Sequence, residues 1–337
     1  MASATLTKHQ SLAVYSQGIY TRLPMFLFTD NITFARRCIP QSDNWQPCHI
    51  SSLAPPLAVL ATELFDGDSI MRTEIDTDGH WDYLFAVNRS RRSQYDILSR
   101  LATSGRELPD RVVCCAGSGD EFHGFKSRSW KACEGNIHLS ALVKPESEIP
   151  GAAVGFMIAS VIAALQTVGS YDLQGATPVI KWVNDVLVQG SKVGGVLARL
   201  QTQGTVTESV VVGIGLNIEQ SPPVERGPFV PRAAALSDFA EPSEPCSHSN
   251  AFPRLLEHLG NNLETLGQGH FAELFDTYRQ HSVVLGRRVV IFEDSQAASP
   301  GVIARGRVGS IGPSLELFID GISEPVMKGR LRLEKDV

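Results

Sequence analysis

The chain has 337 residues, of which 43% are hydrophobic and 20% are charged. A chain of this length can hold two or three domains and bury a core large enough to fold without disulfides or a structural metal. Its formal net charge of -6 at pH 7 argues against a general affinity for nucleic acid or anionic lipid, so any anion must be bound by a local group of residues.

The cysteines and the apolar segments indicate the compartment. The six cysteines form no CxxC pair and no Cys/His metal-binding spacing, which favours reduced, structural thiols. The longest apolar stretch, 152–168, is short for a membrane span and contains Gly155 and Ser160, so it predicts a buried helix. The first 29 residues lack acids but also lack a signal-peptide core, and a transit peptide has little support. We therefore expect a cytoplasmic protein.

Residues 1–85 give the least distinct pattern of the chain. A helix is expected at about 57–65, and the region contains no basic recognition helix of a DNA-binding motif. Ser93 begins a helical pattern that ends at Gly105, and a strand is expected at 111–116.

A polar stretch at 117–130, GSGDEFHGFKSRSW, comes next. Its glycines let backbone amides approach a ligand, and Arg128 can form forked bonds to phosphate oxygens. We expect a mobile loop that can fold over a phosphate. A half-buried strand at 135–144 and the buried helix at 152–168 follow it.

The chain is organised around residues 179–200, VIKWVNDVLVQGSKVGGVLARL. Two apolar strands are expected there, one on each side of the turn signal Gln-Gly-Ser at 189–191. They carry two lysines, an asparagine and an aspartate, and burying these groups costs free energy unless they are paired. An anionic ligand with a metal ion would pair them. On this pattern alone, a partly exposed hairpin with its charges in water is the simpler interpretation.

The remaining pattern predicts a strand, a helix and a small β-domain. The strand at 209–218 contains Gly213 and Gly215, which suit close approach of the backbone to a ligand but do not precede a helix as in a dinucleotide fingerprint. Residues 220–250 are expected to cross the surface, and a helix starts near Pro253 with Asn250 as a possible cap. The short strands expected after Gly286 lie at 288–292, 302–308, 315–319 and 331–333, and they suit a small β-barrel.

These motifs, in this order, resemble those of the biotin protein ligases in the biotin/lipoate ligase superfamily, over about residues 86–335. The most specific similarity is between Lys181-Trp182-Val183-Asn184-Asp185 and the family's KWPND, followed by Lys192-Val193-Gly194-Gly195 and its GxKVxGIL turn. Gly135-Asn136-Ile137 with Ser140 is similar to GNLxxS, and Val212 to Asn217 is similar to VxGIGxN.

The resemblance implies an α+β fold with a mixed β-sheet flanked by helices, like that of class II synthetases, and a C-terminal SH3-like β-barrel. The domains expected from it are an N-terminal region of unclear fold at 1–85, a catalytic domain at 86–282 and the SH3-like domain at 283–337. The partner implied is an acceptor carrier domain of the biotin carboxyl carrier type. We expect neither nucleic acid nor membrane as a partner, and a monomer or a homodimer.

The chain departs from the family pattern at two places. Where the family has GRGRxGRxW, residues 122–130 lack two of the arginines. Because each would contribute about 1.5 to 3 kcal/mol to binding an adenylate phosphate, their loss predicts weaker retention of the intermediate, with Lys126 or His123 as partial substitutes. Ser93-Gln94-Tyr95 stands where the family has STN, and Gly119 stands where it has a ligand-binding glutamine.

The chemistry implied is ATP-dependent activation of biotin as an acyl-adenylate, with Mg2+ as cofactor. Lys192 would bridge the carboxylate and the α-phosphate, and Lys181 would hold the phosphates. Asn184 and Asp185 would position Mg2+ or the nucleotide, Asp185 being the metal ligand. Arg128 and Trp130 would close over the nucleotide, while the amides of Gly213 and Gly215 and the strand around Ser140 line the acid and adenylate sites. The other binding residues implied are Ser93, Gln94, Tyr95, Gly119, His123, Gly124, Phe125, Lys126, Asn136, Trp182, Gly194, Gly195 and Asn217.

Two other functions stay open. A ligase of the same superfamily for lipoate, octanoate or another acid would share the adenylation residues, since the divergent positions lie on the acid and phosphate loop. A turnover-deficient binding or regulatory relative would explain the missing arginines. Taken singly, Trp130 and Trp182 are also compatible with a core position, Asn217 with a turn, and Ser140 with a strand hydroxyl.

Overall fold

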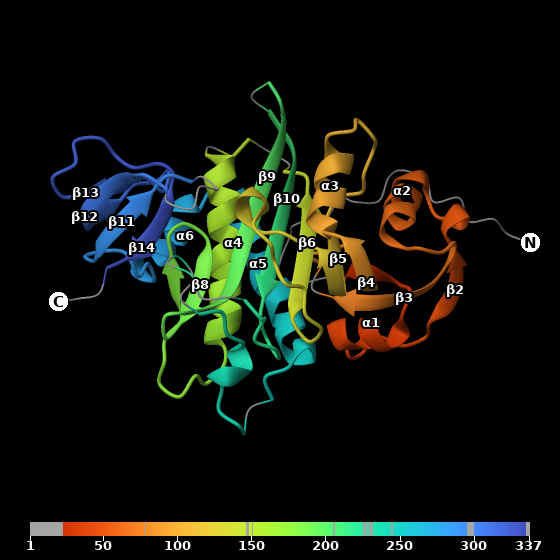
Figure 1. The fold of residues 1–337 in the computed structure, drawn as a ribbon. Coiled ribbons are helices and arrows are strands. Elements are labelled where there is room, and N and C mark those ends of the chain that lie inside the picture. The colour runs from red at the N-terminus through yellow and green to blue at the C-terminus, as the bar shows by residue number, and fades with distance from the viewer. Residues whose placement is uncertain are drawn as a thin grey trace, which may run out of the picture.

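The computed structural model describes residues 23–334 except 78, 146, 147, 150, 205, 225, 226, 228, 230, 231, 244 and 295–299. Within this part of the chain the strands form a ten-stranded sheet, in the order β2-β3-β1-β4-β5-β6-β10-β9-β8-β7, and a four-stranded sheet, in the order β13-β12-β11-β14. Figure 1 shows the N-terminal strands at one end of the molecule and the four-stranded sheet at the other. The transit peptide considered for the first 29 residues falls mostly on residues 1–22, which lie outside the described part.

The N-terminal segment is part of the large sheet. Strand β1 pairs antiparallel with β3 and parallel with β4, which in turn pairs with β5. The expected boundary at 85/86 therefore falls inside β4. The helix expected at 57–65 is confirmed as α2. The elements are β1 (Leu23–Thr29), α1 (Ile32–Cys38), β2 (Gln46–His49), η1 (Ile50–Ser52), α2 (Pro55–Leu64), β3 (Ser69–Thr77), β4 (Tyr83–Arg92) and α3 (Gln94–Ala102).

The middle of the sheet is antiparallel from β5 onward. The predicted strands at 111–116, 135–144 and 209–218 are confirmed, but β5 continues to Glu121, so the loop expected from residue 117 begins only at Phe122. The elements are β5 (Val112–Glu121), η2 (Phe125–Ser127), β6 (Ile137–Val143) and β10 (Val206–Leu216).

The central hairpin is confirmed, with one correction. Gln189 and Gly190 have φ values of 47° and 73°, as a tight two-residue turn between β8 and β9 requires. The single strand expected before it is wrong, because the chain also reverses between Lys181 and Asp185, which pair across two short strands. The strands are β7 (Val179–Lys181), β8 (Asp185–Val188) and β9 (Ser191–Gln203).

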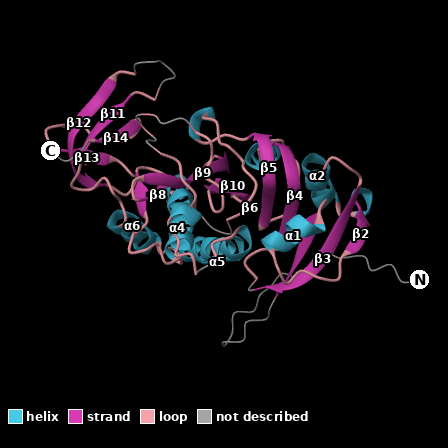
Figure 2. Cartoon of the chain, turned by 60° about the horizontal axis from the view of Figure 1, so that its bottom comes forward, coloured by secondary structure: helices cyan, strands magenta, loops and turns pink. Residues whose placement is uncertain are grey.

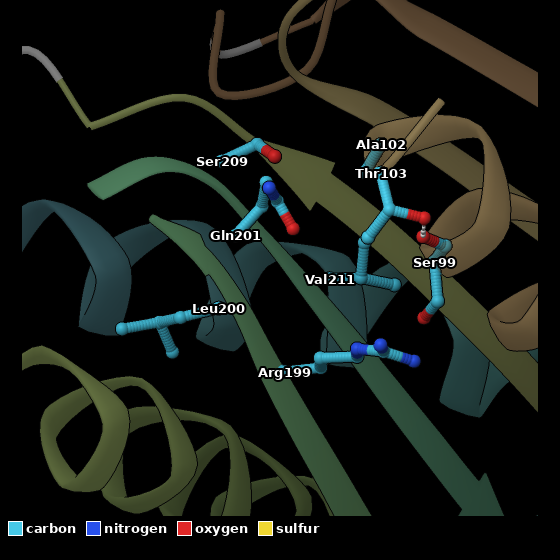
Figure 3. A pocket seen from close by; sticks show the side chains of 8 residues that line it. All are labelled: Ser99, Ala102, Thr103, Arg199, Leu200, Gln201, Ser209 and Val211. Carbon is cyan, nitrogen blue, oxygen red and sulfur yellow. Dashed lines mark hydrogen bonds between the residues drawn. The ribbon is translucent and has the colours of Figure 1, made fainter. Parts of the chain in front are cut away.

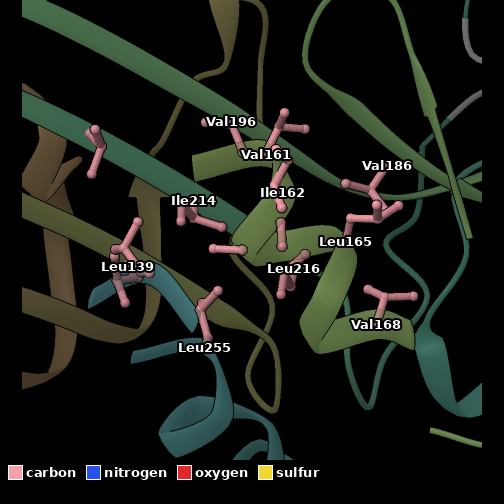
Figure 4. Close-up of a cluster of buried hydrophobic side chains, with 14 of the residues drawn as sticks. Leu139, Val161, Ile162, Leu165, Val168, Val186, Val196, Ile214, Leu216 and Leu255 are labelled. Atoms are coloured by element: carbon pink, nitrogen blue, oxygen red, sulfur yellow. The ribbon is translucent and has the colours of Figure 1, made fainter. Parts of the chain in front are cut away.

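Helices α4 (Ala152–Gly169), α5 (His248–Gly267) and α6 (Phe271–Gln280) cover one face of this sheet, as the turned view in Figure 2 shows. Helix α4 has the length and apolar composition of a membrane span, but 72% of it is buried inside the molecule. Its apolar side chains meet those of β9, β10 and α5 in Figure 4, as expected of a buried core helix. Helix α5 begins earlier than predicted, with Ser247 as its N-cap and Pro253 inside it.

The C-terminal strands form an antiparallel sheet at the four predicted places. Contacts with the rest include the Trp182 indole, which donates to the Leu315 carbonyl at 2.7 Å, and Lys126 Nζ, which lies 3.0 Å from Asp294 Oδ2. The strands are β11 (Arg288–Phe292), β12 (Val302–Ile311), β13 (Leu317–Ile319) and β14 (Arg330–Leu333), and a 3-10 turn, η3 (Leu236–Asp238), precedes α5.

Candidate active site

Three charged side chains meet where β7, β8 and β9 lie side by side. Lys192 Nζ donates to Asp185 Oδ1 at 2.5 Å, and Lys181 pairs with Asp185 across β7 and β8. Burial by itself would raise the pKa of the Asp185 carboxyl, but Lys192 and Lys181 outweigh it and hold that pKa below its ordinary value. The aspartate is therefore ionised at neutral pH, and the group carries one net positive charge when both lysines are protonated.

Lys181 is the most buried of the three, with 8% of its surface exposed. Its Nζ donates to the Phe229 carbonyl at 2.6 Å, and the Phe229 ring lies 3.8 Å from the Arg330 guanidinium. Burial lowers the pKa of Lys181, and Asp185 opposes that effect. A buried ammonium with one carbonyl partner and a carboxylate on the facing strand is suited to binding an incoming anion.

The Lys192 side chain reaches from β9 toward β10, the strand that contains Gly213 and Gly215 and is called the glycine strand below. A Cβ added at Gly195 would lie 3.2 Å from its Nζ, so the lysine crosses over a position without a side chain. The Nζ is also 5.9 Å from the centre of the Trp130 ring. Next to this group, Asn184 donates from Nδ2 to the Val196 carbonyl at 2.5 Å, which fixes the amide plane.

Aromatic side chains lie directly on the glycines of β10. A Cβ added at Gly215 would overlap the Trp130 indole, and one at Gly213 would come within 3.0 Å of the Tyr95 ring. Gly215 also pairs with Gly195 on β9, which places Trp130 beside the Lys192 group. The two glycines are required here because these rings occupy the space of a side chain.

Trp130 is oriented by His138. Its Nε1 donates to His138 Nδ1 at 3.2 Å, and His138 Nε2 donates to the Cys133 carbonyl at 3.0 Å. Burial lowers the pKa of His138 to about 4, so the ring is neutral and its tautomer is fixed by these two bonds. His138 thus has a positioning role.

Hydrogen bonds hold the predicted ligand loop, residues 122–130, in place. Trp130 N donates to the Phe122 carbonyl at 2.9 Å, and Gly124 N donates to the Arg128 carbonyl at 2.7 Å. His123 lies between Asp96, 2.7 Å from Nε2, and the Gly124 carbonyl, 3.0 Å from Nδ1. Burial lowers the pKa of His123, but both hydrogen bonds outweigh it and raise that pKa.

The two basic residues of this loop point to different partners. Arg128 is exposed and donates from Nε to the Phe125 carbonyl at 2.8 Å. Lys126 pairs with Asp294 at the edge of the C-terminal sheet. Gly119 lies further back, on β5, where an added Cβ would overlap Phe122.

The N-terminus of α3 brings the divergent Ser93-Gln94-Tyr95 segment to the same side. Ser93 is the N-cap, and Tyr95 contacts Gly213 and lies edge-on to His123. Gln94 is fully buried, and neither its amide nitrogen nor its amide oxygen has a hydrogen-bond partner within the described residues. Such an amide costs free energy in an apolar core, which makes it a candidate for a ligand contact.

Several predicted residues have their polar atoms engaged by the protein. Asn136 Oδ1 accepts from the backbone N–H groups of 218, 219 and 220, so its amide fixes the end of β10. Trp182 is 6% exposed and binds the C-terminal sheet. Asn217 donates to the Ala234 carbonyl at 3.2 Å, Ser140 is buried opposite Gly213, and at Gly194 an added Cβ would overlap Leu216.

A shallow surface recess lies between α3 and strands β9 and β10 (Figure 3). It is lined by Ser99, Ala102, Thr103, Arg199, Leu200, Gln201, Ser209 and Val211, none of which the sequence indicated. Arg199 also affects Tyr95. Burial raises the pKa of the tyrosine hydroxyl, and the Arg199 guanidinium offsets only part of this rise. An arginine in an alternating strand gives no sequence signal that separates it from a solvated one.

Comparison with known sequences supports the assignment of this region. Residues 121–217 match the profile of the biotin/lipoate A/B protein ligase family. These residues are therefore similar to that family. The matched segment runs from the end of β5 to Asn217 and includes Lys181, Asp185, Lys192 and the glycine strand.

Two bacterial proteins are similar to parts of this chain. The bifunctional ligase/repressor BirA of Bacillus subtilis is 31% identical over 134 residues, which are 38% of this chain and 40% of that protein. The biotin--[acetyl-CoA-carboxylase] ligase of Mycobacterium tuberculosis is 29% identical over 240 residues, 70% of this chain and 82% of that protein. The chain thus spans less than half of the Bacillus relative.

Solved structures share the fold of most of this chain. The biotin protein ligase of Aquifex aeolicus, in complex with biotin and ATP, superposes with a TM-score of 0.57 at 19% identity, over 75% of this chain and 99% of that one. The α+β class with a large mixed sheet is therefore confirmed.

Proposed function

We propose that this chain is an AMP-forming ligase of the biotin protein ligase type. It activates biotin with ATP as an acyl-adenylate and transfers the acyl group to a lysine of an acceptor carrier domain of the biotin carboxyl carrier type. The observation that carries the proposal is the Lys181–Asp185–Lys192 group beside the glycine strand. The family match and the names of the relatives agree with it.

The first step joins two anions. A carboxylate and an α-phosphate about 4 Å apart repel by roughly 4 kcal/mol at an effective dielectric of 20. Lys192 lowers this repulsion by lying between them, and for this it exchanges the Asp185 carboxylate for the substrate oxygens. Lys181, the more buried lysine, holds the phosphates.

Asp185 is the residue best suited to hold Mg2+. Its carboxylate is ionised because the two lysines keep its pKa low, and the amide oxygen of Asn184 is a second hard ligand nearby. When bound, the ion neutralises phosphate charge and orients the leaving pyrophosphate. If Asp185 bound the ion, Lys192 would lose its present partner and would be free to contact the carboxylate of the substrate acid.

The loop at 122–130 closes the site in this proposal. Arg128 and Trp130 cover the nucleotide, with Gly124 and Phe125 at the tip of the loop and the Lys126–Asp294 pair holding that tip against the C-terminal sheet. Residues 86–282 form the catalytic part and 283–337 an SH3-like barrel, while residues 23–77 extend the catalytic sheet. The protein acts in the cytoplasm as a monomer or homodimer.

A different acid is the second candidate, because the acid side of the site is where the chain is unusual. The unpartnered Gln94 amide and the Tyr95 ring on Gly213 replace the family's STN segment. A buried amide offers both a donor and an acceptor, so it favours a carboxylic acid with a polar head group. Lipoate and octanoate, whose far ends are apolar, are the other acids of this second candidate.

Calorimetry and pyrophosphate release separate these candidates. Binding of ATP and biotin is measured singly and together, and pyrophosphate release is then measured with biotin, lipoate and octanoate. Strong synergy with biotin and release of pyrophosphate support the ligase, and release with another acid but not with biotin identifies the second candidate. Binding of an acid with no release for any acid would overturn the proposed enzyme and favour a regulatory relative.

A further inference from the structure

Two cysteines and a histidine meet in the core, away from the residues proposed for ligation. Cys38 is the last residue of α1, Cys115 lies in β5, and His248 is the first residue of α5. All three side chains are buried, with exposed fractions of 0%, 0% and 1%. The two Sγ atoms and one imidazole nitrogen of His248 all lie within 4.8 Å of one another. Three distant parts of the chain thus converge on one point.

The orientation of His248 favours a metal ligand. Its Nδ1 lies 3.1 Å from the Arg37 carbonyl, and since a carbonyl only accepts, Nδ1 carries the proton. The other nitrogen, Nε2, faces Cys115 Sγ at 3.9 Å and can give its lone pair to an ion. Histidines that bind metals almost always donate their second N–H in this way. Stacking on Phe252 holds the ring plane.

The sulfur atoms suit the same purpose. Cys38 and Cys115 are both fully buried, and each Sγ lies within 4.8 Å of the other and of the imidazole nitrogen. Both sulfur atoms can therefore reach a single ion placed between them and His248. The neighbouring Cys114 belongs to the apolar cluster on the opposite face of the sheet and takes no part in the group.

We propose that Cys38, Cys115 and His248 bind a thiophilic divalent metal ion such as Zn2+. In a tetrahedral zinc site with Zn–S of about 2.3 Å and Zn–N of about 2.0 Å, an S···N separation of about 3.5 Å is expected, about 0.4 Å shorter than the 3.9 Å between Cys115 and His248. Two thiolates, one neutral imidazole and a divalent ion sum to zero charge, the state that a dry core tolerates best. Thiolate ligands also exclude Mg2+ and Ca2+.

The ion would join α1, β5 and α5. Helix α1 belongs to the N-terminal part of the chain, whereas α5 follows the matched ligase segment, so the site connects two regions that are far apart in sequence. Its role is structural, and it does not depend on the function proposed above. Because the ligands are buried, loading takes place during folding.

The test uses the full-length chain refolded without oxygen in the presence of Zn2+ or Co2+, followed by removal of free metal. We expect one equivalent of metal per chain and, for Co2+, a thiolate charge-transfer band in the near ultraviolet. Cys38→Ala, Cys115→Ala and His248→Gln should each lose the bound metal, whereas Cys114→Ala, which changes an equally buried cysteine one residue away, should keep it. A Cys133→Ala/Cys246→Ala variant excludes binding to the two less buried thiols.

A thermal readout keeps the test valid if a variant folds poorly. Metal should raise the Tm of the wild type by about 5 °C at a hundredfold excess over Kd. His248→Gln, which retains both thiols, should show no such rise. The proposal is overturned if the wild type binds no metal, if binding survives Cys115→Ala, or if mass spectrometry of the protein finds a Cys38–Cys115 disulfide.

Discussion

Lys192 Nζ lies 2.5 Å from Asp185 Oδ1, so the lysine proposed to bridge the two substrates is already paired with an aspartate. The pair orients the lysine in a partly buried place, where an unpaired ammonium would cost free energy. An incoming polyanion, with its metal ion, can take over both partners at once.

The first prediction concerns Lys192. Lys192→Ala should lower the rate of acid-dependent ATP–pyrophosphate exchange by about 10² to 10³, because a preorganised charge donor is lost. Lys192→Arg keeps the charge and should lose less. Exposed Lys328→Ala is the control, and far-ultraviolet circular dichroism checks the fold. A near-normal rate in Lys192→Ala would remove this residue from the mechanism.

The second prediction compares two glycines of β10. Gly215→Ala should displace the Trp130 indole, shift its fluorescence and weaken binding of the acid and nucleotide, because the new methyl group overlaps the ring. Gly213→Ala should have a smaller effect, since its Cβ would lie 3.0 Å from Tyr95 and a small movement relieves the contact. Equal effects of the two substitutions would contradict the proposed place of Trp130.

The third prediction concerns Gln94. Gln94→Leu should raise the free energy of unfolding by about 1 to 3 kcal/mol, because it removes a buried amide that lacks partners. If the amide contacts the acid, the same substitution should weaken acid binding without changing ATP binding. Ser282→Ala, which removes another buried unpaired group, is the control and should leave acid binding unchanged. A stabilised variant with normal acid affinity would exclude Gln94 from the site.

The fourth prediction is a pH dependence. The folded state raises the pKa of His123, since the Gly124 carbonyl and Asp96 outweigh burial. The stabilisation is therefore complete below the ordinary histidine pKa of about 6.5 and is lost as pH rises through the higher pKa of the folded protein. Urea unfolding of the wild type and His123→Gln should show a stability difference that shrinks with rising pH over this range. His270→Gln, at an exposed histidine, is the control. A difference that grows with pH would contradict the assignment.

Local patterns in the sequence predicted most elements, because periodicity and turn residues act over a few positions. The Gln189–Gly190 turn, helix α4 and the C-terminal strands all followed from such signals. The reversal between Lys181 and Asp185 did not, since the apolar run that crosses it carries no glycine or proline.

Long-range contacts account for the other differences. The pairing of β1 with β3 and β4 depends on which strands meet, which no local pattern encodes. The motif around Asn136 could be found from the sequence. The sequence did not reveal that the side-chain oxygen Oδ1 of Asn136 accepts from three backbone N–H groups just after β10. Cys38, Cys115 and His248 likewise show no metal spacing along the chain, because the fold alone brings them together.

Strands β3, β1, β4 and β5 are neighbours in one hydrogen-bonded sheet. This has a practical consequence for preparing shorter forms of the protein. A fragment that begins at residue 86 would lose part of β4 and leave the backbone of β5 incompletely paired. An uncovered apolar edge of this kind recruits strands from other molecules, so such a fragment should aggregate on expression, whereas one that begins at Leu23 should stay dispersed.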